Sequence, residues 1–244
     1  MSRFHLFSRC VCAGLFSYSL SLTMPELPQA QAVTPTNPIS WNFLAGDYSQ
    51  YDAAGMPPDL DNIPAKSFSD SFWTRLSSAL PERQDIRQHN PQLITDDAGA
   101  NIALGEAGEV FLTFLHEGAG FKNSLGYFVF DPENPPQTLA EVQEIMVFPN
   151  VSFHDDGGNP RGLKSGQTVK LGDFPAGAHI GFVLASNGFD ANTGIKSNMA
   201  RDQIFTTLKD LNSETDVALK AHTVLLYDTE SQQVVLGLED MLRT

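Results

Sequence analysis

Several carboxylates stand directly after strongly apolar runs in this sequence. Glu117 follows EVFLTFLH, Glu239 and Asp240 follow VVLGL, and Asp131 and Asp228 end the runs LGYFVFD and HTVLLYD. Apolar runs of this length are typical of β-strands, and residues at strand ends can meet at one rim of a folded sheet. Calcium takes about six to eight oxygen ligands, which carboxylates and nearby backbone carbonyls can supply.

The sequence therefore predicts a calcium (Ca2+) site formed by Glu117, Glu239 and Asp240, with Asp131 and Asp228 as helpers. Two alternatives stay open. A carboxylate pair such as Glu117 and Glu239 could hydrolyse a glycan by acid–base catalysis. Each acid could also simply be solvated or hydrogen bonded to loop amides.

Other catalytic patterns are absent from the sequence. His116-Glu117 begins like a zinc-protease motif, but Gly120 stands where the second histidine belongs, and no nucleophile elbow or phosphate-binding loop occurs. The segment NGFDANTG resembles a calcium loop, but Arg201 occupies the twelfth position where a helix–loop–helix site needs an acid. We expect a short Asx turn around Asp190 instead. These absences favour a binding protein over an enzyme.

Short apolar runs separated by turn residues predict an all-β fold, an antiparallel β-sandwich resembling a jelly roll with one or two short helices. The helical signal is clearest over 67–80, where Ser67 and Asp70 fit a capping box and Phe68, Phe72 and Leu76 form an apolar stripe. Thr138 and Glu141 predict a second short helix. The expected strands span 101–104, 109–115, 125–130, 144–148, 167–171, 179–185, 203–208, 222–228 and 233–239.

The N-terminus has the three-part pattern of a secretory signal. Residues 1–9 are basic, an apolar stretch follows, and Ala30-Gln31-Ala32 fits a cleavage site. We therefore expect residues 1–32 to be a signal peptide, 33–66 an extended proline-rich arm, and 67–244 a single β-sandwich domain. The expected location is secreted, periplasmic or at the cell surface, with no membrane span after cleavage.

Charge and cysteine content narrow the function further. Cys10 and Cys12 are the only cysteines, so the expected mature chain has no disulfide, thiolate–zinc site or cysteine nucleophile. The formal charge is −14. Because Arg3, Arg9 and Glu26 give the first 32 residues a net +1, the expected mature chain carries −15. Such a charge disfavours nucleic acids and anionic membranes as partners.

An ordered series of motifs resembles a bacterial family. FLHEGAGFKNSLGYF, FPNVS, LGDFPAGAHIGFVLASNG, HTVLLYD and GLED are similar to a domain of unknown function found in secreted bacterial proteins, often near their C-termini. The resemblance covers about residues 68–240. It implies a module like those of adhesins and other surface proteins, with calcium binding or enzymic activity, and it places the family's acidic positions on Glu117, Glu239 and Asp240.

One departure from that family concerns the end of the chain. In the family, the Glu-Asp pair leads into a second acidic stretch and a closing strand, whereas this sequence ends at Thr244. The resemblance therefore predicts a domain lacking its usual C-terminal end, with fewer oxygen ligands and an unfilled sheet edge that favours self-association. The resulting hypothesis is an exported binding or surface-interaction module that calcium stabilises and whose partner is a polysaccharide or a cell-surface protein. The alternatives are a glycan hydrolase and a ligand-free structural module.

Overall fold

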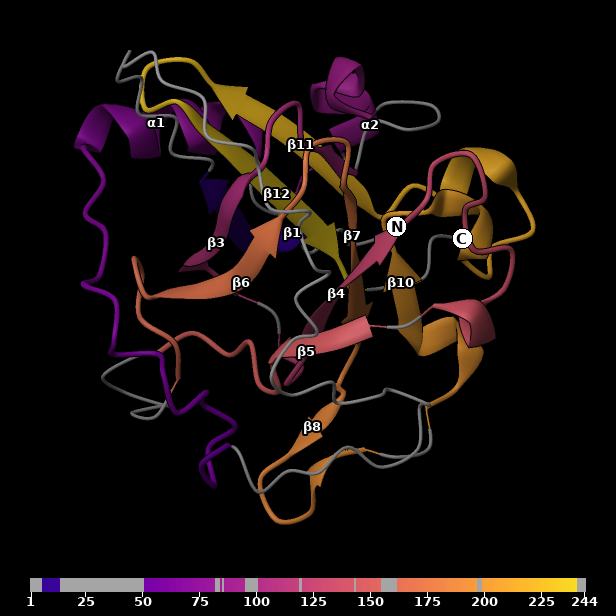
Figure 1. Cartoon of the computed structure of the whole chain (residues 1–244), viewed down its shortest axis with the longest axis horizontal. Helices are drawn as coiled ribbons and strands as arrows, with labels where there is room; N and C mark the ends of the chain where they lie inside the picture. The colour runs from indigo at the N-terminus through magenta and orange to yellow at the C-terminus, as the bar shows by residue number, and fades with distance from the viewer. Residues whose placement is uncertain are drawn as a thin grey trace, which may run out of the picture.

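The computed structural model describes residues 6–13, 51–81, 84, 86–94, 101–118, 120–142, 144–154, 162–196 and 199–240, with residues 6–13 described by their backbone alone. It is an antiparallel β-sandwich, which confirms the predicted all-β fold (Figure 1). None of the helices in these ranges is long and apolar enough to cross a membrane.

The first sheet has five strands in the order β11-β12-β1-β3-β6. Each neighbouring pair is antiparallel. The strands are β1 (Leu6–Ala13), β3 (Gly108–His116), β6 (Thr168–Phe174), β11 (Thr223–Asp228) and β12 (Gln233–Glu239).

The second sheet has the order β10-β7-β4-β5, and β2 also pairs with β7. The strands are β2 (Ile102–Ala103), β4 (Ser124–Phe130), β5 (Glu144–Phe148), β7 (His179–Ala185) and β10 (Ile204–Thr206). A separate hairpin joins β8 (Phe189–Asp190) to β9 (Gly194–Ile195). Two of the expected strands, 101–104 and 203–208, are thus shorter than predicted.

Three apolar clusters explain why the strands are apolar at consecutive positions. Leu112 and Phe114 of β3, with Leu236 of β12, face the core between the sheets. Their neighbours Leu115 and Val235 face a second cluster on the outer side of the first sheet. A third cluster covers the outer side of the second sheet with Phe128, Val183 and residues of the later loops. Because both faces of the central strands are covered over most of their length, the strict alternation of a half-exposed sheet is lost there.

Helix α1 (Asp70–Ala79) covers the outer face of the first sheet, beside β11 and β12 in Figure 1. Phe72 and Leu76 pack there, as the apolar stripe predicts. The expected cap at Ser67 is wrong. Ser69 caps the helix by accepting a hydrogen bond from the Phe72 amide at 3.2 Å, which places the first turn two residues later. Asp70 is therefore the first helical residue and not a partner in a capping box.

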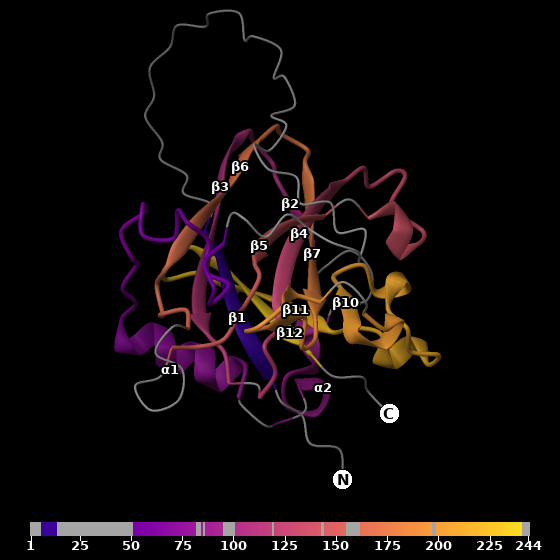
Figure 2. The same cartoon turned by 90° about the horizontal axis from the view of Figure 1, so that it is seen from below.

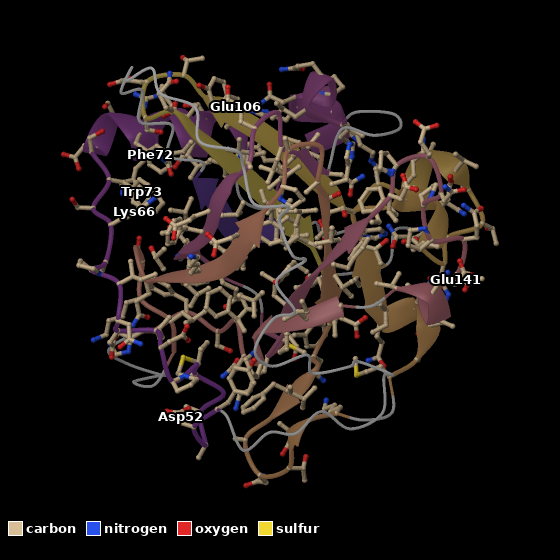
Figure 3. The ribbon with its side chains drawn as sticks, in the orientation of Figure 1. Asp52, Lys66, Phe72, Trp73, Glu106 and Glu141 are labelled. Carbon is tan, nitrogen blue, oxygen red and sulfur yellow. The ribbon has the colours of Figure 1, made fainter. Side chains whose placement is uncertain are left out.

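The remaining short helices are single turns. They are α2 (Ile86–His89) and the 3₁₀ turns η2 (Pro91–Leu93), η3 (Leu139–Glu141), η4 (Arg201–Gln203), η5 (Lys209–Leu211) and η6 (Val217–Leu219). The predicted Thr138–Glu141 turn is η3, in which the threonine hydroxyl donates to the Glu141 carboxylate at 3.0 Å. Figure 3 shows Glu141 on the opposite side of the molecule from Phe72 and Trp73 of α1.

Residues 51–66 of the expected arm run along the sandwich, whereas 33–50 lie outside the described residues. Leu60 is buried in the core between the sheets, and the Tyr51 hydroxyl donates to the Met146 carbonyl at 3.2 Å. The Lys66 amide donates to the Gly166 carbonyl at 2.8 Å. This described part of the arm is thus anchored at several points.

Candidate functional site

Strand direction decides which predicted acids can meet. β3 and β12 each run antiparallel to β1, so they are parallel to each other and finish at the same edge of the sheet. Glu117 directly follows β3. Glu239 is the last residue of β12, and Asp240 directly follows it. We call this end of the sandwich the acidic edge and define it by Glu117, Asn123, Glu239 and Asp240.

All three carboxylates of the acidic edge are buried, and those of Glu117 and Asp240 accept hydrogen bonds from other parts of the fold. Glu117, Glu239 and Asp240 are 5%, 2% and 2% exposed. The Glu117 carboxylate accepts a hydrogen bond from the Phe153 amide at 3.1 Å. The Asp240 carboxylate accepts one from the Asn123 side chain at 2.8 Å. Burying a carboxylate is costly unless hydrogen bonds or a positive charge compensate for lost water.

Asn123 connects the acidic edge to both sheets. It was not among the site residues predicted from the sequence. It is fully buried just before β4, and its side-chain oxygen accepts a hydrogen bond from the Asn187 amide at 2.9 Å. Its backbone carbonyl accepts one from Val151 at 2.8 Å. No pattern in the sequence marks this asparagine, because its partners are 28 to 117 residues away and meet it only after folding.

A buried histidine–glutamate pair lies beside the same edge. His222 precedes β11, and its carbonyl accepts a hydrogen bond from the Glu239 amide at 2.8 Å. The His222 ring hydrogen bonds with Glu214 and packs on Phe205, with ring centroids 4.2 Å apart. Neither residue was among the site residues predicted from the sequence. Both side chains are buried, which is consistent with a structural role for the pair.

The two predicted helper acids lie elsewhere. Asp228 pairs with Gln233 at the opposite end of the β11–β12 ladder, about five residues or ~17 Å from the acidic edge. Its carboxylate is bonded to the Arg75 guanidinium at 2.7 Å and to Ser231, and these contacts, chiefly Arg75, lower its pKa. Asp131 follows the far end of β4, roughly 20 Å from Ser124, and its pKa is lowered by hydrogen bonds from Asn134 and Glu133. The structure therefore does not bring these two acids to Glu117.

Spacing also limits contact within the acidic edge. β1 lies between β3 and β12, so the backbones of those strands are about two strand spacings, or ~10 Å, apart. Within the described ranges, no three histidine, cysteine, aspartate or glutamate side chains are grouped so that they could hold a metal ion.

The expected Asx turn is confirmed, since Asp190 accepts hydrogen bonds from the amides of Asn192 and Thr193.

The fold and the acidic edge together define a β-sandwich with buried carboxylates at one end. The model of a family described as a domain of unknown function (DUF4114) matches residues 174–244. No curated protein and no solved structure matches the chain. The match spans the segment from the end of β6 through β12 and includes Glu239 and Asp240, whereas Glu117 and the motif around it lie outside. Similarity to a domain of unknown function is thus confirmed for this C-terminal part.

Proposed function

We propose that the chain is an exported binding module whose acidic edge takes a calcium ion. One observation carries this proposal: Glu117, Glu239 and Asp240 come from distant parts of the chain and are all at least 95% buried at the same end of the sandwich. The described side chains do not form a ready-made group of three metal ligands, so binding would have to draw these carboxylates together. Buried carboxylates favour a nearby cation, and calcium suits oxygen ligands.

The ion would bind the folded state in preference to the unfolded chain and so stabilise the loops that leave the acidic edge. Those loops include the connection from Glu117 to Asn123, which carries the exposed Phe121. The proposed partner is a polysaccharide or a cell-surface protein engaged by these loops. We favour a binding module over a hydrolase, because Glu117 and Asp240 are buried and hydrogen bonded to Phe153 and Asn123.

Thermal unfolding with calcium or with a chelator tests the metal site. Calcium at about 100 times its Kd should stabilise the fold by about 2.7 kcal/mol, which raises Tm by roughly 5–10 °C. Asp240→Asn and Glu117→Gln should each reduce the calcium-dependent rise in Tm. Asp190→Asn is the matched control, because its Asx turn lies in the separate β8–β9 hairpin, and it should retain the full rise. Equal Tm values in calcium and chelator would contradict the proposal.

A further inference from the structure

The strand β1 occupies the middle of the first sheet, between β12 and β3 (Figure 2). Its residues Arg9 to Cys12 pair on both sides, for example Cys10 with Leu236 and with Phe114. We call the space between β3 and β12 the β1 slot. Its two walls present the backbone groups that β1 satisfies.

Export would empty this slot. Residues 6–13 lie within the leader that the sequence predicts to be removed, so the exported chain would lack the strand. β3 and β12 would then stand about 10 Å apart, and each would have one edge without its ladder partner. Unpaired backbone groups at such edges are costly when buried and are templates for another strand.

The two walls cannot simply close on each other. β3 and β12 are parallel to each other, so direct pairing would put a parallel ladder into an antiparallel sheet. One strand would also have to move about 5 Å toward the other to reach the normal strand spacing. Phe114 and Leu236 are both fully buried in the core between the sheets. Val235 is fully buried on the opposite face, against the cluster that contains α1. Closing the slot would therefore disturb packing on both faces.

The walls also specify what can enter. Register position 10 lies between Phe114 and Leu236, and position 11 lies between Thr113 and Val235. All four wall residues are buried, so an occupant needs small or apolar residues at successive positions. Position 9 pairs with His116 and Gly237, next to Glu117 and close to Glu239, so charge complementarity favours a basic residue there.

We propose that the exported chain accepts into the β1 slot an extended segment of another exported polypeptide, which runs antiparallel to both β3 and β12. The segment has a basic residue at the acidic edge, followed by at least four small or apolar residues. A second copy of this chain is a poorer occupant, because each exported copy would have lost residues 6–13 and would carry a charge of −15. This inference depends on export in the proposed function and does not depend on calcium.

The first test is the mass of the chain recovered from outside an exporting bacterial cell. A mass without residues 6–13 is expected. If the recovered chain retains them, the slot is permanently filled and the proposal is overturned, although export itself is upheld. If the chain stays inside the cell, the proposed function also fails.

The second test adds a peptide of sequence LFSRCVCA, in reducing buffer with a chelator, to the recovered chain. Hydrogen exchange in β3 and β12 should slow at least tenfold on addition, with β4 and β7 as the internal reference. A peptide carrying Val11→Pro should bind at least tenfold more weakly, because proline removes a backbone donor and cannot sit in a central strand. A peptide carrying Arg9→Glu should also bind more weakly. Equal binding of the three peptides would overturn the proposal.

A third experiment covers the case in which the exported chain is unstable alone. The full chain, purified with residues 6–13 in place, carries a protease site between residues 13 and 33. After cleavage, a labelled LFSRCVCA peptide should replace the released strand over hours, and the Val11→Pro peptide should not. Complete retention of the original strand, or uptake of both peptides, would count against an exchangeable slot.

Discussion

Asn123 and Asp240 are 117 residues apart in the chain, yet the asparagine amide donates a 2.8 Å hydrogen bond to the aspartate carboxylate inside the protein. The same asparagine accepts from the Asn187 amide at 2.9 Å. One side chain thus connects the start of β4, the loop after β7 and the end of β12. The acidic edge is therefore a tertiary structure in which the carboxylates of Glu117 and Asp240 are hydrogen bonded to partners distant in the chain.

We expect Asn123→Ala to lower the free energy of unfolding by about 2–4 kcal/mol, because it leaves the buried Asp240 carboxylate and the partly buried Asn187 amide without this partner. Asn123→Asp should lower the free energy of unfolding more at pH 7 than at pH 4, because it places a second carboxylate beside Asp240. Urea unfolding of the purified chain at both pH values measures these effects.

Asn134→Ala provides the control. Asn134 makes the same kind of hydrogen bond, to Asp131 at 3.0 Å, but on the exposed surface. Its loss should cost no more than about 0.5 kcal/mol, since water replaces the partner. A comparable loss of stability in both variants would show that burial is not the source of the Asn123 effect.

Asp228 should make stability depend on acid pH. The Arg75 guanidinium, and to a smaller degree Ser231, hold the pKa of this carboxyl below its ordinary value. A lowered folded-state pKa gives stability that is present above the unfolded value of about 3.9 and lost as pH falls through the folded value. Asp228→Asn should thus cost about 1–2 kcal/mol at pH 7, after allowance for the partial exposure of Arg75, and much less near pH 2.

The exposed partner of the same arginine is the matched control. Glu230 also pairs with Arg75, but its side chain is 64% exposed. Glu230→Gln should change the unfolding free energy by less than about 0.5 kcal/mol at any pH. Equal pH profiles for the wild type and Asp228→Asn would mean that the ion pair does not contribute to acid stability.

The sequence predicted the fold well because its signals are local. The run EVFLTFL, for example, is apolar at successive positions because Phe114 faces one buried layer and Leu115 the other. The cap of α1 was misplaced because Ser67 and Ser69 are equally suitable residues, and only the packing of Phe72 and Leu76 decides which turn starts the helix.

The acidic edge was only partly predictable. Glu117 and Glu239 end strands that run in the same direction, but strand ends alone do not reveal direction, so Asp131 and Asp228 looked equivalent to them. Topology separates the two groups. Asn123, Glu214 and the position of β1 depend on contacts between distant segments, for which a single sequence holds no signal.

Glu144 should give stability the opposite pH dependence. It is 2% exposed on β5, and burial raises its pKa to about 8. Between the unfolded pKa of about 4.3 and the folded value, the folded chain keeps a proton that the unfolded chain releases, so stability falls as pH rises through this window. Glu144→Gln should remove that decline. The unfolding free energy of the variant, relative to that of the wild type, should therefore rise by about 2–4 kcal/mol between pH 4 and pH 8.

The readout is the difference in urea midpoint between Glu144→Gln and the wild type from pH 4 to pH 8. Glu141→Gln is the control on the neighbouring turn, because Glu141 is exposed and its hydrogen bonds with Gln137 and Thr138 lower its pKa. The difference in urea midpoint between Glu141→Gln and the wild type should change only below about pH 5 and should stay constant from there to pH 8. A flat Glu144→Gln difference over the same window would show that the carboxyl ionises normally in the fold.

Gly166 should contribute to anchoring the arm, because its conformation and its surroundings both exclude a side chain. Its φ is +90°, and a Cβ atom would overlap the Lys66 carbonyl oxygen, beside the hydrogen bond from the Lys66 amide to the Gly166 carbonyl. Gly177 has a similar φ of +81°, but nothing lies within 4 Å of its Cβ position. Gly177→Ala should therefore cost only the backbone strain of about 1 kcal/mol, whereas Gly166→Ala should cost at least about 2 kcal/mol. Limited proteolysis should then cut residues 51–66 faster in Gly166→Ala than in Gly177→Ala, and equal cutting would show that this contact does not hold the arm.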